Sequence, residues 1–556
     1  MKWFIYLCTI TILLNPTSSI LQKQVITPTP TVLGVGDIVL VMVDQLPMYA
    51  TASDSGPIVF ELVKGYSSRL LKTQTDSNGK KWLYLSDNLH GWVPAEVNKQ
   101  PSIVIRNDNQ TQSLIDGATK VLSENPQSAA YLTRALAYMV RRDYKDAATD
   151  FTTAIQQWPD DAQLYLYRTF LDADNYDYQQ QNLDAAKATV LNRRLPFAYI
   201  RWGLALNNLG QISASEKAFT AAIQQTPDYA VPYYGLSSLY DHYTQYDQAL
   251  ANANDAIQRD PLFGFAVSLR GFIYQHESQY DKAAQDFNQS IVVDPYCSAC
   301  YINRGQFLGQ FQGDEQGALA DFNKAIEVDP FNADAYANRG ISNARASLYD
   351  KAIADLEYAT QLAPKSFYAF FSLGGVYAEV GQYAQSINAY TTAIPLGSGY
   401  PSSVLIYRAQ VYLAVGNYEA ALNDLNILIA NSDTEYFHTV ALLLRGEIYL
   451  YLHRFDLALR DYSAVVSNAA VAGFVKDYNN QGRGFWITLP RQGELNQLEQ
   501  MSKANPSDAS SLYALATLQM EFGLWSQANV TYQSYFTLTK TPIPSSLAQL
   551  LQLLTN

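Results

Sequence analysis

The chain has 556 residues, a formal net charge of −13 and only three cysteines. Its length exceeds that of one compact domain, and its acidic balance disfavours a nucleic-acid partner, which requires basic patches. The five histidines lie far apart, so no metal-ligand spacing is visible. The sequence also lacks the common nucleophile, metalloprotease, phosphate-loop and dinucleotide motifs. We therefore expect no catalytic residues, no metal and no cofactor.

The first 32 residues have the composition of a targeting segment. Residues 1–19 combine one lysine, an apolar run from Trp3 to Leu14 and an exit of small residues. This order is typical of an export signal, and the apolar run is short for a membrane span. We expect cleavage near Ser19 and an exported, extracellular or cell-envelope protein; the alternative is an uncleaved segment that anchors the chain in the membrane. The Thr-Pro alternation in residues 20–32 predicts an extended spacer.

Residues 33–98 follow a β pattern. Short β-rich runs at 37–43, 58–63 and 69–73 are separated by turn signals, and the pair Asn78-Gly79 predicts a two-residue hairpin turn. Trp82, Tyr84 and the run 91–94 complete five short strands, which predict a small all-β barrel.

This segment resembles a bacterial SH3-like domain. The family's turn is matched by Ser55-Gly56-Pro57, its "KG" step by Val63-Lys64-Gly65 and its closing G-W-V by Gly91-Trp92-Val93. Members often bind cell-wall peptides or glycans, so the resemblance implies a peptidoglycan ligand. A structural cap or spacer remains the alternative.

One pattern of large residues, small residues and prolines recurs along the rest of the chain. Pro227, Pro261 and Pro295 are 34 residues apart, and so are Pro330 and Pro364, whereas the step from Pro295 to Pro330 is 35. In the clearest unit, 298–332, the pattern residues are Tyr301, Gly305, Ala318, Phe322, Ala325 and Pro330.

The period and pattern resemble the tetratricopeptide repeat (TPR). The resemblance implies a first and a second antiparallel helix in each unit, stacked because one pair cannot bury its own apolar face. Units begin near 128, 162, 196, 230, 264, 298, 333, 367, 402, 436, 471 and 509. The predicted fold class is mostly α: a right-handed α-solenoid of about 11–12 TPR helix-turn-helix units after the small SH3-like barrel.

The same pattern predicts the boundaries of the helical part. We expect a capping helix at 110–127 after a polar link, the TPR array at 128–470, and a terminal repeat with a capping helix at 509–556. Residues 471–508 predict a degenerate repeat or an insertion, because the glycines and asparagines of 479–484 weaken a helix.

Two positions vary together within the chain. Seven units carry Arg at the seventh place of the first helix and Asp just before the second-helix aromatic residue. The pairs are Arg134 with Asp150, Arg168 with Asp184, Arg270 with Asp286, Arg304 with Asp321, Arg339 with Asp355, Arg408 with Asp424, and Arg445 with Asp461. Units with Trp202, Leu236, Leu373 or Leu515 in the Arg place carry Ala218, Asn252, Ala389 or Thr531 in the Asp place. We therefore predict structural ion pairs that join the two helices of these units.

TPR arrays usually bind extended peptides or partner proteins in a concave groove that the first helices line, and the resemblance implies the same here. The groove candidates off the packing places are Tyr234, Phe265, Phe272, Asn303, Asn338, Tyr368 and Phe371. An asparagine amide can hold a peptide backbone through its donor and its acceptor. Because these places carry almost no Lys or Arg, we expect a basic or apolar partner rather than an acidic chain terminus.

Cys297 and Cys300 lie three residues apart at the start of a first helix, within disulfide reach. After removal of the export signal they are the only cysteines, so we expect a local disulfide or two free structural thiols. Taken together, the sequence predicts a non-enzymatic exported scaffold that binds protein or peptide partners, with the SH3-like domain positioning it at the cell envelope. The alternative is a peptidoglycan-binding protein whose repeats act as a spacer or assembly rod.

Overall fold

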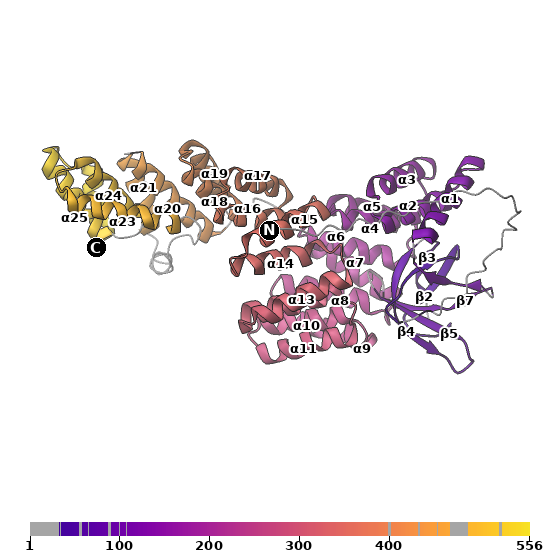
Figure 1. Ribbon diagram of the computed structural model, residues 1–556. Coiled ribbons are helices and arrows are strands. Elements are labelled where there is room, and N and C mark those ends of the chain that lie inside the picture. Colours follow the sequence, from indigo (N-terminus) through magenta and orange to yellow (C-terminus); the bar gives the residue numbers. More distant parts are fainter. Residues whose placement is uncertain are drawn as a thin grey trace, which may run out of the picture.

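The computed structural model describes residues 33–555 except 34, 55–57, 65, 87–89, 99, 107, 398–401, 432–433, 453, 467–487 and 522–524. The predicted export signal and spacer, the Ser55-Gly56-Pro57 turn and Gly65 lie outside the described residues. The predicted fold class is confirmed: an N-terminal antiparallel sheet precedes an array of helix pairs (Figure 1).

The N-terminal strands form a region that we call the β domain. Its strands are β1 Ile38–Val41, β2 Gln45–Tyr49, β3 Ile58–Val63, β4 Ser67–Thr75, β5 Lys81–Ser86, β6 Gly91–Pro94, β7 Glu96–Val97, β8 Gln100–Pro101 and β9 Ile103–Ile105. Seven strands make one sheet in the order β3-β2-β6-β5-β4-β1-β9, and β7 pairs with β8. The β4–β5 hairpin turns at Gly79, whose φ of 81° suits glycine.

The sheet has more strands than the five expected. The apolar run 103–105 lies where the sequence suggests a polar link, yet it forms β9 and pairs with β1 through Val39 and Ile105. Because Ile103 is buried, the gain from removing this run from water outweighs its polar flanks.

Helix pairs occupy most of the remaining chain. They are α2 Ser128–Arg141, α3 Tyr144–Gln157, α4 Ala162–Asp174, α5 Tyr178–Leu191, α6 Pro196–Asn208, α7 Ile212–Gln225, α8 Ala230–His242, α9 Tyr246–Arg259, α10 Gly264–His276, α11 Tyr280–Val293, α12 Ser298–Phe307, α13 Glu315–Val328, α14 Ala333–Arg345, α15 Tyr349–Leu362, α16 Phe367–Glu379, α17 Tyr383–Ala393, α18 Ser402–Ala414, α19 Tyr418–Asn431, α20 Glu435–Tyr451 and α21 Phe455–Val466. Even numbers are first helices and odd numbers are second helices.

Further helices lie at both ends of this array. α1 Asp108–Glu124 precedes the first pair, and α23 Thr488–Ala504, α24 Ala509–Glu521, α25 Trp525–Thr539 and α26 Ser545–Thr555 follow the last. Leu547 of α26 is fully buried in a cluster with Tyr462 and Tyr532, so this terminal helix covers apolar surface of the last units.

Small residues of the first helix face large residues of the second helix. A side chain added at Gly305 would meet the Phe322 ring at 2.7 Å, and one at Gly374 would meet the Tyr390 ring at the same distance. The repeated small–large pattern therefore allows the two helices of a unit to approach closely, as interior packing demands.

The 35-residue unit places its additional residue inside its first helix. After Phe307, the helix continues as a π-helix over Leu308–Gln312. A π-helix takes up one residue without breaking the helix, so Phe307 stays buried while Phe311 becomes half exposed.

Candidate binding groove

The first helices of neighbouring units contact one another and form one layer of the solenoid. Side-chain bonds between neighbouring first helices mark its inner face: the Asn303 amide donates to the Ser268 hydroxyl at 2.9 Å, and the Gln306 amide donates to Asn338 Oδ1 at 2.8 Å. The Tyr368 hydroxyl donates to the same Asn338 oxygen at 3.2 Å. Three predicted groove residues, Asn303, Asn338 and Tyr368, thus belong to one polar row that crosses α10, α12, α14 and α16.

An aromatic group continues the inner face beyond this row. Phe371 of α16 stacks on Phe367 with ring centroids 5.7 Å apart, and it contacts Tyr407 of α18 at 5.5 Å. Phe272 lies elsewhere: its ring packs against Phe287 of the second helix at 5.2 Å and near His276. Phe371 therefore joins two first helices, whereas Phe272 mainly packs within its own unit.

The β domain covers the N-terminal part of the inner face. Tyr234 packs on Phe263 at 5.2 Å, and Phe263 and Phe265 both face the buried ring of His90, at 4.2 and 6.1 Å. Two of the predicted groove residues, Tyr234 and Phe265, consequently lie at an internal contact with the β domain rather than in an open groove.

Aromatic packing makes this contact part of the protein core. Phe60 of β3 lies 4.7 Å from the Phe197 ring and 5.6 Å from the Tyr167 ring, and Tyr66 lies 6.0 Å from the Phe170 ring. All five side chains are buried. Such an apolar interface resembles a core rather than a transient contact between domains.

Tyr167 also covers an edge of the β sheet. Its hydroxyl donates to the Glu61 carbonyl at 2.8 Å and accepts from the Val63 N–H at 3.1 Å. Strand β3 is an edge strand in the sheet order, and exposed edges invite pairing with other chains. The solenoid thus satisfies backbone groups that the sheet leaves unpaired.

Two turns between units hold the other side of the β domain. The Tyr84 hydroxyl donates to Asp260 Oδ2, and the Ser86 hydroxyl donates to Asp294 Oδ2 at 2.7 Å. The second oxygen of each carboxylate accepts a backbone N–H two residues on, so each aspartate also shapes its own Asp-Pro turn. Burial raises the pKa of Asp260 and the pKa of Asp294.

The same turns cover the aromatic cluster of the β domain. Tyr49, Trp82, Tyr84 and Trp92 form this cluster with Leu71, and Leu262 and Tyr296 of the two turns pack against it. Trp82 and Tyr84 are at most 1% exposed. The G-W-V tryptophan that carries the SH3-like resemblance therefore lies under the solenoid.

Contacts between the first two units and later units form what we call the seam. Arg142, after α2, forms an ion pair with Asp329 at 3.6 Å and lies 4.3 Å above the Phe331 ring. Lys365, before α16, binds Asp177 between α4 and α5 at 2.6 Å. Residues 188 positions apart thus meet, so the first two units lie against later ones.

All seven predicted Arg–Asp pairs are close ion pairs in the structure. Each guanidinium donates from Nε and Nη2 to the two carboxylate oxygens at 2.5–2.9 Å. In six pairs the Nη1 atom also reaches a side-chain oxygen of the helix that precedes the unit, which is α1 for Arg134 and a second helix for the others. These acceptors are Thr119, Asn254, Asn288, Asn323, Thr391 and Asn426. The arginines therefore link neighbouring units as well as the two helices of one unit.

Cys297 and Cys300 form a disulfide at the start of α12, with their Cα atoms 5.2 Å apart. Both residues are buried, and the Cys297 sulfur accepts the Cys300 N–H at 3.1 Å. The bond lies next to Asp294 and Tyr296, so it constrains a turn that contacts the β domain.

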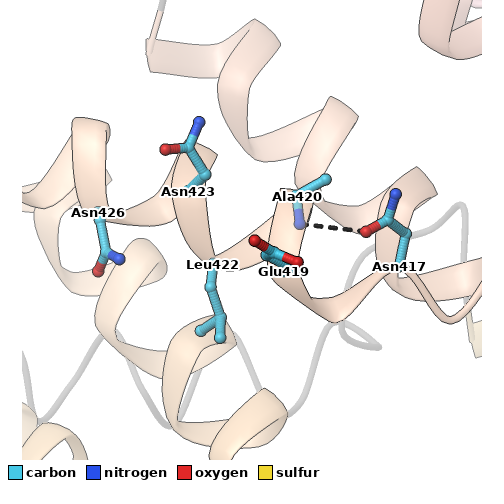
Figure 2. Close-up of a pocket in the computed structure, with 6 residues that line it drawn as sticks. All are labelled: Asn417, Glu419, Ala420, Leu422, Asn423 and Asn426. Carbon is cyan, nitrogen blue, oxygen red and sulfur yellow. Dashed lines mark hydrogen bonds between the residues drawn. The ribbon is translucent and has the colours of Figure 1, made fainter.

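The structure also has a shallow depression on the second helix α19, with a volume of about 590 Å³. Figure 2 shows its six lining residues. Among them, the Asn417 amide oxygen accepts a hydrogen bond from the Ala420 N–H at 3.2 Å. Asn426 meanwhile accepts from Arg445. Asn417 thus already accepts a hydrogen bond at the start of α19, and Asn426 already bonds to the next unit. The depression lies on a second helix, outside the inner face.

Within the described part of the chain, no cluster of His, Cys, Asp or Glu has a metal-binding arrangement. The same residues include no helix with the length and apolar character that crossing a bilayer requires.

These features define a helical-repeat solenoid with an embedded β domain. The sequence profile of the tetratricopeptide repeat family matches residues 132–168, 310–367, 344–401 and 408–472. The chain therefore contains tetratricopeptide repeats. No curated protein sequence matched it.

Several solved structures are similar to parts of the array. PilW, a widely conserved type IV pilus biogenesis factor, is 26% identical; the match covers 38% of this chain and 97% of that one, with a TM-score of 0.34. A TPR protein from Parabacteroides merdae is 17% identical over 44% and 98% of the chains, with a TM-score of 0.33. YrrB, a TPR protein with an unusual peptide-binding site, is 22% identical over 33% and 95%, with a TM-score of 0.22. At these scores the likeness does not indicate a ligand.

Proposed function

We propose that the chain is a non-enzymatic scaffold that binds an extended segment of a protein partner along the first-helix face from α12 to α20. The observation that most supports this proposal is the polar row of Asn303, Gln306, Asn338 and Tyr368. This row lies beyond the part of the inner face that the β domain covers. Amide side chains can exchange such bonds for bonds to a peptide backbone, and Phe371 and Tyr407 offer apolar surface beside them.

The β domain has a structural role in this proposal. Its aromatic cluster is covered by Leu262 and Tyr296, which disfavours the alternative of a peptidoglycan ligand on that surface. We further propose that the protein is exported and acts at the cell envelope, because residues 1–19 have the composition of an export signal. In this arrangement the β domain and the early units form a base, and the later units present the groove.

Site-specific photocrosslinking tests the groove. A photoreactive residue replaces Tyr407 on the inner face or, as the matched control, Val190, which is 72% exposed on the second helix α5. Each full-length variant is exposed to envelope protein extract and irradiated. We expect defined adducts from position 407 and none from position 190. Adducts of equal yield at both positions, or adducts at 190 alone, would contradict the proposal.

A further inference from the structure

Five side chains meet where the seam reaches the inner face, and we call them the seam cluster: Tyr176, Tyr178, Asp334, Asn338 and Tyr368. Tyr176 and Tyr178 come from the α4–α5 junction, whereas the others come from α14 and α16, five and six units later. Helices α4, α14 and α16 all belong to the central part of the array in Figure 1, and the bond of Lys365 to Asp177 fixes the two segments beside each other.

The Asp334 carboxylate is the centre of this cluster. The Tyr176 hydroxyl donates a hydrogen bond to it. Burial, and then the negative charge of Asp334, raises the pKa of Tyr178 and the pKa of Tyr368. The Tyr176 and Tyr178 rings are 6.3 Å apart at 70°. Tyr368 stays 38% exposed, so the cluster is reached from the inner face.

Two neighbouring cations are engaged with other carboxylates, whereas the charge of Arg345 also reaches Tyr368 and opposes the rise in its pKa. Lys365 binds Asp177 at 2.6 Å, Arg339 binds Asp355 at 2.6 Å, and Arg345 lies 3.9 Å from Glu315. Burial raises the pKa of Asp334 above its ordinary value, which is the effect of a carboxylate removed from water without full compensation.

A half-buried carboxylate among tyrosine rings offers a cation two kinds of attraction at once. The charge attracts it directly, and aromatic faces attract it through their quadrupoles. The neighbouring Asn338 oxygen already accepts from Gln306 and Tyr368, so the amide positions the Tyr368 ring beside Asp334.

We propose that the seam cluster binds the ammonium or guanidinium group of a basic residue in the partner, so that the groove selects a segment with a lysine or arginine at this point. The inference rests on the proposed function, since the basic residue belongs to the segment in the groove. The seam then has a role in binding, because it brings the two parts of the cluster together. Neither the α4–α5 junction nor α14 and α16 alone contains the whole cluster.

The test uses the full-length chain and bead-bound libraries of random, N-terminally acetylated ten-residue peptides. The central residue is fixed as Lys, Arg, Gln or Glu. We expect the Lys and Arg libraries to retain at least about tenfold more protein than the Gln library, and the Glu library to retain the least; tenfold corresponds to about 1.4 kcal/mol. The substitution Asp334→Asn keeps the side-chain shape and should abolish this preference.

Two controls separate the inference from the proposed function. Asp350→Asn removes one negative charge from an exposed position on α15 and should leave the preference unchanged. Equal retention of the Lys, Arg, Gln and Glu libraries would overturn the cationic site but leave groove binding intact. An equal loss of the preference in both variants would overturn the site as well, because it would reflect overall charge. Retention of none of the libraries would overturn both proposals.

Discussion

The substitution Asp355→Ala tests the ion pairs that join the units. Asp355 accepts from Arg339 Nε and Nη2 at 2.9 and 2.6 Å, and it also accepts from the Asn343 amide at 3.1 Å. Arg339 in turn donates to Asn323 of the preceding second helix at 2.9 Å. Asp355 is 12% and Arg339 25% exposed, so the pair is largely removed from water.

The expected loss follows from what the substitution leaves behind. Arg339 keeps its charge but loses both carboxylate bonds, and Asn343 loses an acceptor. An exposed pair would contribute at most about 1 kcal/mol, whereas removing one partner of a buried pair costs about 3–5 kcal/mol. Because Arg339 is partly exposed and keeps its bond to Asn323, we expect a loss of about 2–3 kcal/mol in the stability of the surrounding units.

Native-state hydrogen exchange resolves this loss by helix, which matters because repeat arrays need not unfold in one step. The amides of α14 and α15 should exchange faster in Asp355→Ala, and those of α24 should be unchanged. A second variant, Arg339→Leu with Asp355→Ala, copies the pair Leu373 and Ala389 that the chain uses in its next unit, and it should recover most of the loss. A loss below about 0.5 kcal/mol, or a double variant no better than the single one, would refute the reasoning.

Three further predictions concern the β-domain contact, a buried carboxyl group and the disulfide. Tyr167→Phe removes the hydroxyl that accepts the buried Val63 N–H, so urea denaturation should show a loss of about 1–2 kcal/mol; an unchanged midpoint would mean that the edge strand does not need this bond. Burial, and then the charge of Asp184, raises the pKa of Asp172 to about 8. A raised pKa means that the folded state holds the proton more tightly, so stability is fully present below the ordinary pKa near 4 and is lost as the pH rises through about 8. Asp172→Asn should flatten this fall in melting temperature between pH 5 and 8 (~3 pH units), and equal profiles for variant and parent would contradict the assignment. Finally, reduction of the folded chain should add two hydrogen atoms to the intact mass, at Cys297 and Cys300; an unchanged mass after reduction under denaturing conditions would show that no disulfide was present.

The helical part of the fold could be predicted because its information is local and repeated. Gly305 and Phe322 meet because the same small and large places recur every 34 residues, and the joint variation of the Arg and Asp places indicated a contact between them. The additional partner that six of these arginines find on the preceding helix was not predicted. Asn254 and Asn288 lie 16 residues before Arg270 and Arg304, and only the stacking angle of neighbouring units brings these side chains together.

The position of the β domain could not be predicted in the same way. Its contacts join residues separated by more than 100 positions, such as Phe60 with Phe197 and Ser86 with Asp294. A buried aromatic residue has the same sequence signature whether it faces its own unit or another domain. For that reason Tyr234 and Phe265 were expected to lie in an open groove, although they lie at the contact with the β domain.

This placement also determines which part of the solenoid can act on a partner. The early units bind the β domain through side chains that are almost fully buried, among them Phe60, Tyr167 and Phe197. Displacing the domain would return all this apolar surface to water, and one aromatic side chain of this kind contributes about 2–3 kcal/mol. A peptide partner is therefore a poor competitor for that surface. Binding should instead depend on the polar row and the seam cluster, where Tyr368 remains exposed and the required rearrangements are limited to side-chain hydrogen bonds.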